Sequence, residues 1–200
     1  MKLESLKFRS GNLFYITVSG FDGFYLEDIS VYRLGLKEGM EISEELFEKM
    51  KQISSEEGAK RVAARLLSSS RKTVFELKQK LRQKGFDGTS IDAAAEMFIK
   101  NGFLNDREFA ASYVNDAVNF KKYSVRQIKQ KLMQKGIAGD IINEACADLE
   151  DNNQLKRLVE KEMEKCPDKK GIEKLKRRLY SKGFSLGDII KAVGEFENEA

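Results

Sequence analysis

The spacing of apolar and polar positions changes near residue 53. Before that point, β-branched and aromatic residues form three short runs at residues 13–18, 24–26 and 29–32, and glycine-containing turns separate them. These runs predict a small antiparallel meander. Ser43 follows as a typical helix N-cap with two glutamates behind it, which predicts a short helix to about residue 53.

Beyond residue 53 the apolar residues recur at helical spacing, and a ten-residue pattern occurs three times without gaps. Its copies are residues 77–86, 128–137 and 175–184, and each reads apolar-x-x-x-Leu-x-x-Lys-Gly-apolar. Apolar residues four positions apart, with cations between them, indicate an amphipathic helix. The glycine indicates that the helix ends there, and the apolar residue after it packs back on the last turn. Three related units are therefore predicted.

A further helix is expected on each side of every copy. The apolar residues of the expected first helices are Val62, Ala63 and Leu66, then Phe109, Tyr113, Val114 and Ala117, then Leu155, Leu158 and Val159. Those of the expected third helices are Ile91, Ala94, Ala95 and Phe98, then Ile141, Ala145 and Leu149, then Ile189, Val193 and Phe196. Capping-box patterns predict helix starts at Ser54, Thr73, Asn105 and Ser124.

These patterns predict a mainly α protein of tandem three-helix repeats, preceded by a small β-rich segment. The expected boundaries are 1–53 for the β-rich segment and 54–102, 103–151 and 152–200 for the repeats. One repeat of this size buries little apolar surface alone, so we expect neighbouring repeats to stack in an elongated, curved array. A monomer is the simplest expectation.

Charge is distributed unevenly along the chain. The formal charge is +4, but residues 1–55 carry 7 basic and 9 acidic residues, whereas residues 56–200 carry 29 basic and 23 acidic ones. The helical part therefore carries the net positive charge of the chain, which favours an anionic partner. Apolar segments of signal-peptide or membrane-spanning length are absent from the sequence, so we expect a cytoplasmic location.

Residues that carry catalysis are scarce. The chain has no histidine, no glycine-rich phosphate loop, no Gly-x-Ser-x-Gly elbow and no cluster with metal-ligand spacing. We therefore expect a non-enzyme without cofactor or metal. Cys146 and Cys166 are expected to be reduced, with Cys146 in the core, and Pro167 is the single proline.

Two coupled motifs resemble the RecX family. They are Glu76-Leu77-x-x-Lys80-Leu81-x-x-Lys84-Gly85-Phe86 and Asn101-Gly102-Phe103-Leu104-Asn105-Asp106-x-x-Phe109-Ala110-x-x-Tyr113-Val114, and the resemblance covers about residues 55–195. It implies a regulator of recombination and repair that binds the RecA recombinase and its filament on single-stranded DNA, lies in the filament groove and restrains ATP hydrolysis and strand exchange. The third repeat departs from the family pattern, since residues 169–171 replace its capping box.

Cations of the middle helices are the candidate contacts to phosphate or an acidic surface. Their recurrence at one phase of three stacked repeats would track an anionic polymer better than an isolated patch. Tyr123 is the aromatic residue that we expect to be exposed for base stacking, with Tyr180 as another candidate, whereas Tyr113 is expected in the core. The candidate cations are Lys78, Lys80, Arg82, Lys84, Lys121, Lys122, Arg126, Lys129, Lys131, Lys135, Lys174, Lys176, Arg177, Arg178 and Lys182.

Two alternatives remain open at this point. A helix-turn-helix reading would need base-reading donors on the third helices, but residues 90–96 and 139–144 are acidic there, which disfavours sequence-specific recognition. A nonspecific nucleic-acid-binding or protein-interaction module unrelated to RecA is the other alternative. The residues alone do not distinguish inhibition of a partner from assistance.

Overall fold

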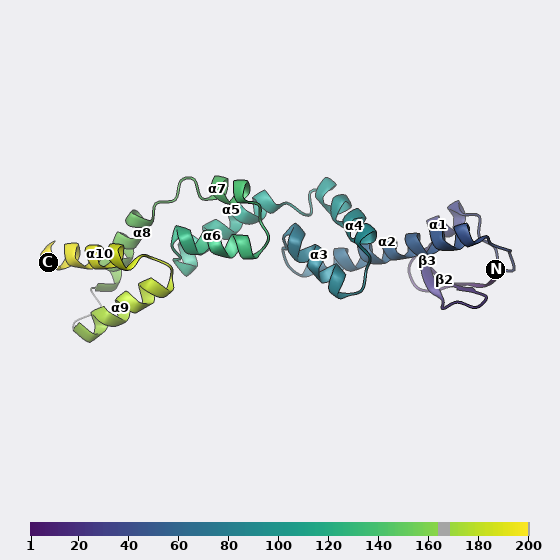
Figure 1. The fold of residues 1–200 in the computed structure, drawn as a ribbon, viewed down its shortest axis with the longest axis horizontal. Coiled ribbons are helices and arrows are strands. Elements are labelled where there is room, and N and C mark those ends of the chain that lie inside the picture. Colours follow the sequence, from purple (N-terminus) through teal and green to yellow (C-terminus); the bar gives the residue numbers. More distant parts are fainter. Residues whose placement is uncertain (164–168, 200) are drawn as a thin grey trace. The chain divides into compact units, whose positions relative to one another are not determined.

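The computed structural model describes residues 1–163 and 169–199, which form ten α-helices, one π-helical turn and three β-strands (Figure 1). Cys166 and Pro167 lie outside the described residues. The chain divides into an N-terminal unit, Met1–Leu104, and a C-terminal unit, Asn105–Ala200. The predicted class, mainly α with a small N-terminal sheet, is confirmed. Within the described residues, no helix is long and apolar enough to cross a membrane.

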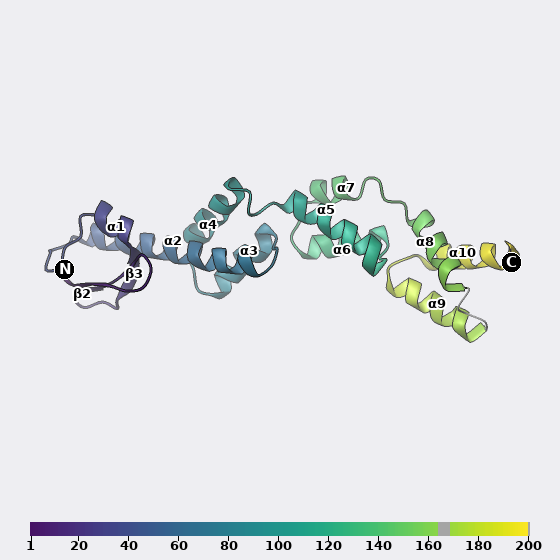
Figure 2. The same cartoon turned by 180° about the vertical axis from the view of Figure 1, so that it is seen from behind.

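A three-stranded antiparallel sheet with the order β1-β2-β3 begins the N-terminal unit. The strands are β1 (Leu3–Phe8), β2 (Leu13–Val18) and β3 (Phe24–Glu27). Both views of the fold show the sheet beside the first part of helix α2 (Glu44–Ser69) (Figures 1 and 2). Buried side chains of the sheet, Ile16 and Leu26 among them, pack there against Phe47 and Met50 of α2.

The prediction of a strand at residues 29–32 is wrong, because this segment forms helix α1 (Asp28–Arg33). The hydroxyl of Ser30 donates to the Glu57 carboxylate at 2.5 Å, and Val31 is buried in the same core as the sheet. The apolar residues of this segment therefore do not divide into a buried and an exposed strand face, since Ile29 and Tyr32 are both exposed.

Strand β1 takes the place of that third strand, and the sequence pattern did not identify it. Leu3 and Leu6 both pack in the sheet core although they are three positions apart. An irregularity between Leu3 and Ser5 shifts the register with β2, and such a bulge breaks the two-residue alternation that marks a strand.

Helix α2 runs without interruption from Glu44 to Ser69, so the expected break near residue 53 is wrong. Ser43 caps its start as predicted, with its side chain accepting from the Leu46 N–H. Ser54 is not an N-cap. The Glu57 carboxylate, which would complete a capping box, instead accepts from the Glu27 N–H at 2.7 Å and from Ser30. These bonds join the sheet to the middle of α2.

Repeat 1 consists of the second part of α2 and two short helices. Helix α3 is Val74–Gln83, and helix α4 is Gly88–Lys100. Thr73 and Glu76 form the predicted capping box at the start of α3. Leu77 and Leu81 of α3 pack with Ala63 and the predicted apolar face of α4, which includes Ile91.

Repeats 2 and 3 form the C-terminal unit. Repeat 2 contains α5 (Asp106–Asp116), the π-helical turn η1 (Ala117–Lys121), α6 (Val125–Gln134) and α7 (Gly139–Ala145). Repeat 3 contains α8 (Asp151–Met163), α9 (Lys169–Ser181) and α10 (Leu186–Glu199). Asn105 and Ser124 cap α5 and α6 as predicted.

Each repeat has its own apolar core, and the apolar residues predicted for its helices fill that core, except in the third helix of repeat 2. In repeat 2, the buried residues of the third helix region are Ile142 and Cys146, whereas Ile141, Ala145 and Leu149 are only partly buried. The buried face of α7 is thus shifted by one position from the prediction, because Ile142 and Cys146 are the residues that share a core with Ile128 and Leu132 of α6. Burial raises the pKa of the Cys146 thiol, which fits the predicted core position.

The glycine of each ten-residue pattern ends the middle helix as predicted. Gly85, Gly136 and Gly183 have φ values of 87°, 75° and 93°. The next residue donates to the helix carbonyl five positions before it, as from Phe86 to Leu81, which is the Schellman arrangement. The decamers therefore fold as equivalent structures.

Candidate nucleic-acid interface

Three of the candidate cations are held by polar groups of their own repeat. The Nζ atom of Lys78 lies 2.7 Å from the Asp92 carboxylate, and that of Lys129 lies 3.1 Å from the amide oxygen of Asn143. Arg178 pairs with Glu162 at 2.5 Å. These contacts fix one helix of a repeat to another, so the three cations have a structural role.

The other candidate cations differ in their exposure and in their polar partners. Those on the outside of the N-terminal unit are exposed and have no ion pair within residues 1–163 and 169–199: Lys80, Arg82 and Lys84. The exposed cations of the C-terminal unit with the same property are Lys121, Arg126, Lys174 and Arg177. The continuous stripe of charge along the repeats stays a prediction.

A lysine–aromatic cluster lies in the C-terminal unit and unites several predicted residues. It consists of Phe109, Tyr113, Tyr123, Lys121, Lys131, Lys135 and Lys182. The Nζ atoms of Lys131 and Lys182 lie 5.3 Å and 5.7 Å from the centroid of the Tyr123 ring. Attraction between an ammonium group and the face of an aromatic ring stabilises this arrangement. The cluster gathers four cations around three rings.

Tyr123 does not have the exposed position that the sequence predicted. Its ring is partly buried against the core of repeat 2 and faces two lysines. The physical reason is the π-helical turn before it, which ends at Lys122 in a left-handed conformation with φ 56° and turns the chain inward. Tyr123 therefore positions cations; it is not an open platform for a base.

The exposed aromatic residues lie elsewhere. Phe103 and Phe120 are 71% and 77% exposed, and Tyr180 is 63% exposed. Leu104, beside Phe103, is buried. The rings of Phe103 and Phe98 meet edge to face, and the Phe103 N–H donates to the Phe98 carbonyl at 3.0 Å.

The electrostatics of the cluster reflect how closely its charges lie. Burial lowers the pKa of Lys182, and the positive charges of Arg178 and Lys122 lower it further, against the opposing effect of Glu162. Burial and the neighbouring Tyr123 raise the pKa of Tyr113. Like charges held near one another favour binding of an anion, because the anion relieves their repulsion.

Direct hydrogen bonds hold repeats 2 and 3 together at the start of α6. The Ser124 N–H donates to the Lys182 carbonyl at 2.9 Å, and the Val125 N–H donates to the Asp151 carboxylate at 2.6 Å. The ammonium group of Lys182 also donates to the Lys121 carbonyl. This junction keeps the C-terminal end of α9 beside the lysine–aromatic cluster.

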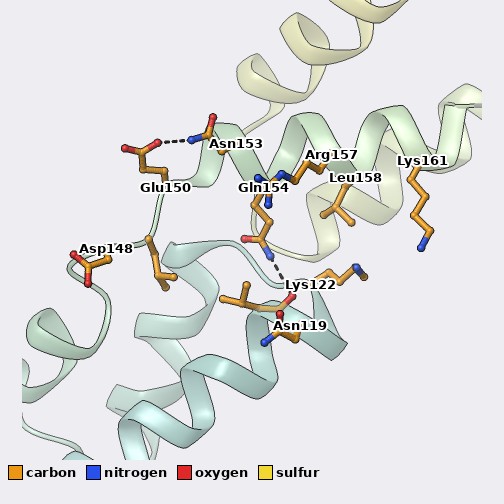
Figure 3. Close-up of a pocket in the computed structure, with 11 residues that line it drawn as sticks. Asn119, Lys122, Asp148, Glu150, Asn153, Gln154, Arg157, Leu158 and Lys161 are labelled. Atoms are coloured by element: carbon orange, nitrogen blue, oxygen red, sulfur yellow. Dashed lines mark hydrogen bonds between the residues drawn. The ribbon is translucent and has the colours of Figure 1, made fainter.

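A cavity of about 620 Å³ lies between η1, the connection before α8 and α8 itself (Figure 3). Lys122, Arg157 and Lys161 line it, and none of the three has a hydrogen bond or ion pair to another described side chain. In Figure 3 the carboxylates of Asp148 and Glu150 lie at one end of the cavity and Lys161 lies at the other. The cavity can therefore receive an anionic group at its basic end.

Arg157 and Lys161 were not among the predicted site residues, because the prediction considered only the middle helices of the repeats. A signal was available: the two cations lie four positions apart on α8 and therefore on one face of that helix. The left-handed Lys122 beside them could not be foreseen, since a positive φ at lysine is uncommon.

Comparisons with known proteins identify the repeats. Residues 59–96 match the family model of the first three-helix domain of RecX, and residues 105–145 match that of the second. A regulatory protein RecX of Clostridioides difficile is 36% identical over 172 residues, which cover 82% of this chain and 79% of that protein. The chain belongs to the RecX family. The resemblance expected from the sequence motifs is thereby confirmed.

Further RecX proteins agree in sequence and in fold. A regulatory protein RecX of Vibrio parahaemolyticus is 34% identical over 145 residues, covering 70% of this chain and 92% of that protein. A crystal structure of a regulatory protein RecX superposes with a TM-score of 0.69 at 20% identity, over 97% of this chain and 98% of the other. That likeness confirms the fold.

Proposed function

We propose that this chain binds the RecA recombinase and its filament on single-stranded DNA and restrains ATP hydrolysis and strand exchange by that filament. In this proposal the chain is a cytoplasmic regulator of recombination and repair, without catalytic activity or a cofactor of its own. Membership of a family whose members are named regulatory proteins supports this class of function.

The observation that carries the proposal is the gathering of cations in the C-terminal unit. Lys121 and Lys131 cover aromatic rings, and Lys122, Arg157 and Lys161 line the cavity beside them. Phosphate groups along a nucleic-acid strand attract such a group of cations and release counterions on binding. A surface of this kind steers a regulator towards a filament whose DNA is anionic.

The acidic third helices support this proposal over specific DNA reading. Asp92 of α4 pairs with Lys78, and Asp140 and Glu144 of α7 pair with Arg107. A recognition helix in a major groove would instead present unengaged donors to the bases.

The test measures ATP hydrolysis by RecA on poly(dT) as purified chain is added. We expect the rate to fall with the unaltered chain. The double variant Arg157→Glu/Lys161→Glu should need a several-fold higher concentration for the same effect, because two cations of the cavity become anions. The matched control is Lys37→Glu/Lys49→Glu, which makes the same charge change on exposed residues of the N-terminal unit. It should behave as the unaltered chain.

An unchanged rate together with no co-sedimentation of the unaltered chain with the filament would refute the proposal. The alternative, a nonspecific nucleic-acid-binding module, predicts affinity for a dT oligonucleotide that falls steeply with salt but no effect that depends on the recombinase. If the two cavity cations each contact a phosphate, reversing their charges should reduce the slope of log affinity against log salt concentration for single-strand binding by about 1.4.

A further inference from the structure

Repeat 3 carries an exposed apolar groove of about 350 Å³ between α9 and α10. Tyr180, Leu186 and Ile190 line it, and these side chains are 63%, 54% and 54% exposed. The remaining lining residues are charged and belong to α9: Glu173, Lys176 and Arg177. Exposed apolar patches are a common feature of surfaces where another molecule binds.

The equivalent place in repeats 1 and 2 is closed by a polar contact. Counted from the glycine that ends each middle helix, Lys78 and Asp92 of repeat 1 correspond to Lys129 and Asn143 of repeat 2. The Nζ-to-oxygen distances in these two pairs are 2.7 Å and 3.1 Å. Each pair therefore joins the middle helix of its repeat to the third helix.

Repeat 3 has lost this contact. The residue that corresponds to Asp92 and Asn143 is Ile190, whose side chain cannot accept a hydrogen bond. Lys176, which corresponds to Lys78 and Lys129, pairs instead with Glu173 on its own helix at 3.0 Å. At another equivalent position, Leu186 replaces a glycine of repeats 1 and 2. The groove is thus a property of repeat 3 and not of the repeat fold.

The charge around the groove indicates the chemistry of its occupant. Helix α9 contains six basic residues and one acidic residue within residues 169–181. Carboxylates on a partner would therefore be attracted to the rim at Lys176 and Arg177, while an apolar side chain would displace water from the groove. A nucleic-acid backbone supplies the negative charge but no aliphatic side chain.

We propose that the groove of repeat 3 binds an acidic segment of a partner protein, with an apolar side chain of that segment between Tyr180, Leu186 and Ile190 and its carboxylates against Lys176 and Arg177. The inference rests on the proposed function, since the partner in question is the protein of the filament that the chain regulates. It assigns the groove between α9 and α10 to protein contact and the basic cavity beside α8 to DNA.

The test uses Ile190→Asp in the full chain, which introduces the residue that repeat 1 has at this position. The side chain is exposed, and an aspartate there can pair with Lys176, so the fold should persist and the melting temperature should change little. The control is Met133→Asp, which also adds a charge at an exposed apolar residue, on α6 of repeat 2. Ile190→Asn, the residue of repeat 2, is a second variant without a charge.

Binding to the RecA filament and to a free dT oligonucleotide is measured for each variant. Loss of an apolar residue at the centre of a protein contact should weaken filament binding at least about tenfold, whereas oligonucleotide binding stays within twofold. Filament binding that is equal for Ile190→Asp, Ile190→Asn and the unaltered chain would overturn the groove assignment alone. Equal weakening of filament and oligonucleotide binding would also overturn it, because the groove would then contact DNA. If the unaltered chain does not bind the filament, both proposals fail.

Discussion

Two constraints favour glycine at position 183, the backbone conformation and the close approach of repeat 2, and a pair of substitutions can separate their effects. Its φ of 93° lies in the region that disfavours side chains, which should cost about 1–2 kcal/mol in Gly183→Ala. A Cβ atom at this position would also lie 2.5 Å from the Ser124 hydroxyl and 2.8 Å from Cβ of Gln127, both in repeat 2. Overpacking of this kind adds about 1–3 kcal/mol.

Gly85→Ala is the matched control, because Gly85 has a φ of 87° but nothing within 4 Å of an added Cβ. Urea unfolding followed by circular dichroism should therefore show a larger loss for Gly183→Ala than for Gly85→Ala. Hydrogen exchange measured by NMR should show loss of protection at the Ser124 N–H, which donates to the Lys182 carbonyl, in Gly183→Ala only. Equal losses of stability, with the Ser124 N–H still protected, would refute the contact between repeats.

Two further predictions concern single side chains. Leu132→Ala should reduce the free energy of unfolding by about 2–5 kcal/mol, because Leu132 is fully buried. Met133→Ala, at a 67% exposed site, should change this free energy by less than about 0.5 kcal/mol. Similar losses for the two variants in urea titrations would contradict the assignment of buried and exposed faces on α6. Asp87 caps the start of α4, where its carboxylate accepts from the Ser90 N–H. Hydrogen bonds from Ser55 and Ser90 lower the pKa of Asp87 from 3.8 to about 2, so the stability that this N-cap contributes is present above about pH 4 and lost as the pH falls towards 2. Asp87→Ala should cost about 1 kcal/mol at pH 7, and a difference from the unaltered chain that stayed constant down to pH 2 would count against this origin.

The repeats could be predicted from the sequence because their signals are local. The spacing of Leu77 and Leu81 and the glycine after them describe one helix and its end within ten residues, and three copies support the same interpretation. Capping residues such as Thr73 act on a helix that begins beside them. Patterns of this kind need no knowledge of the rest of the chain.

The errors occur where a distant segment determines the structure. Glu57 had the spacing of a capping residue, but its carboxylate binds a backbone N–H and a hydroxyl group about 30 residues away in sequence. Ile29 and Tyr32 had the composition of a strand, yet helix α1 forms because Ser30 and Val31 are buried against α2 and the sheet. Tertiary contacts override local propensity in both cases.

The sequence predicted which cations belong to the candidate site, but only part of their arrangement in space. Four predicted lysines do meet around aromatic rings. Lys78 and Lys129 bind polar groups of neighbouring helices instead, and the sequence gives no sign of such partners. The cavity near Arg157 depends on the π-helical turn, for which the sequence contains no recognised signal.

The continuous helix α2 has a consequence for how this protein could be shortened. Its first part supplies Phe47 and Met50 to the core below the sheet, and its second part supplies Ala59 and Ala63 to the core of repeat 1. A cut at residue 53 would divide one hydrogen-bonded helix and separate the Glu57 carboxylate from the Glu27 N–H and the Ser30 hydroxyl, which donate to it. Truncation or domain exchange in this protein should therefore keep α2 together with α3 and α4, and the chain after Leu104 is the first place where it can be cut without loss of either core.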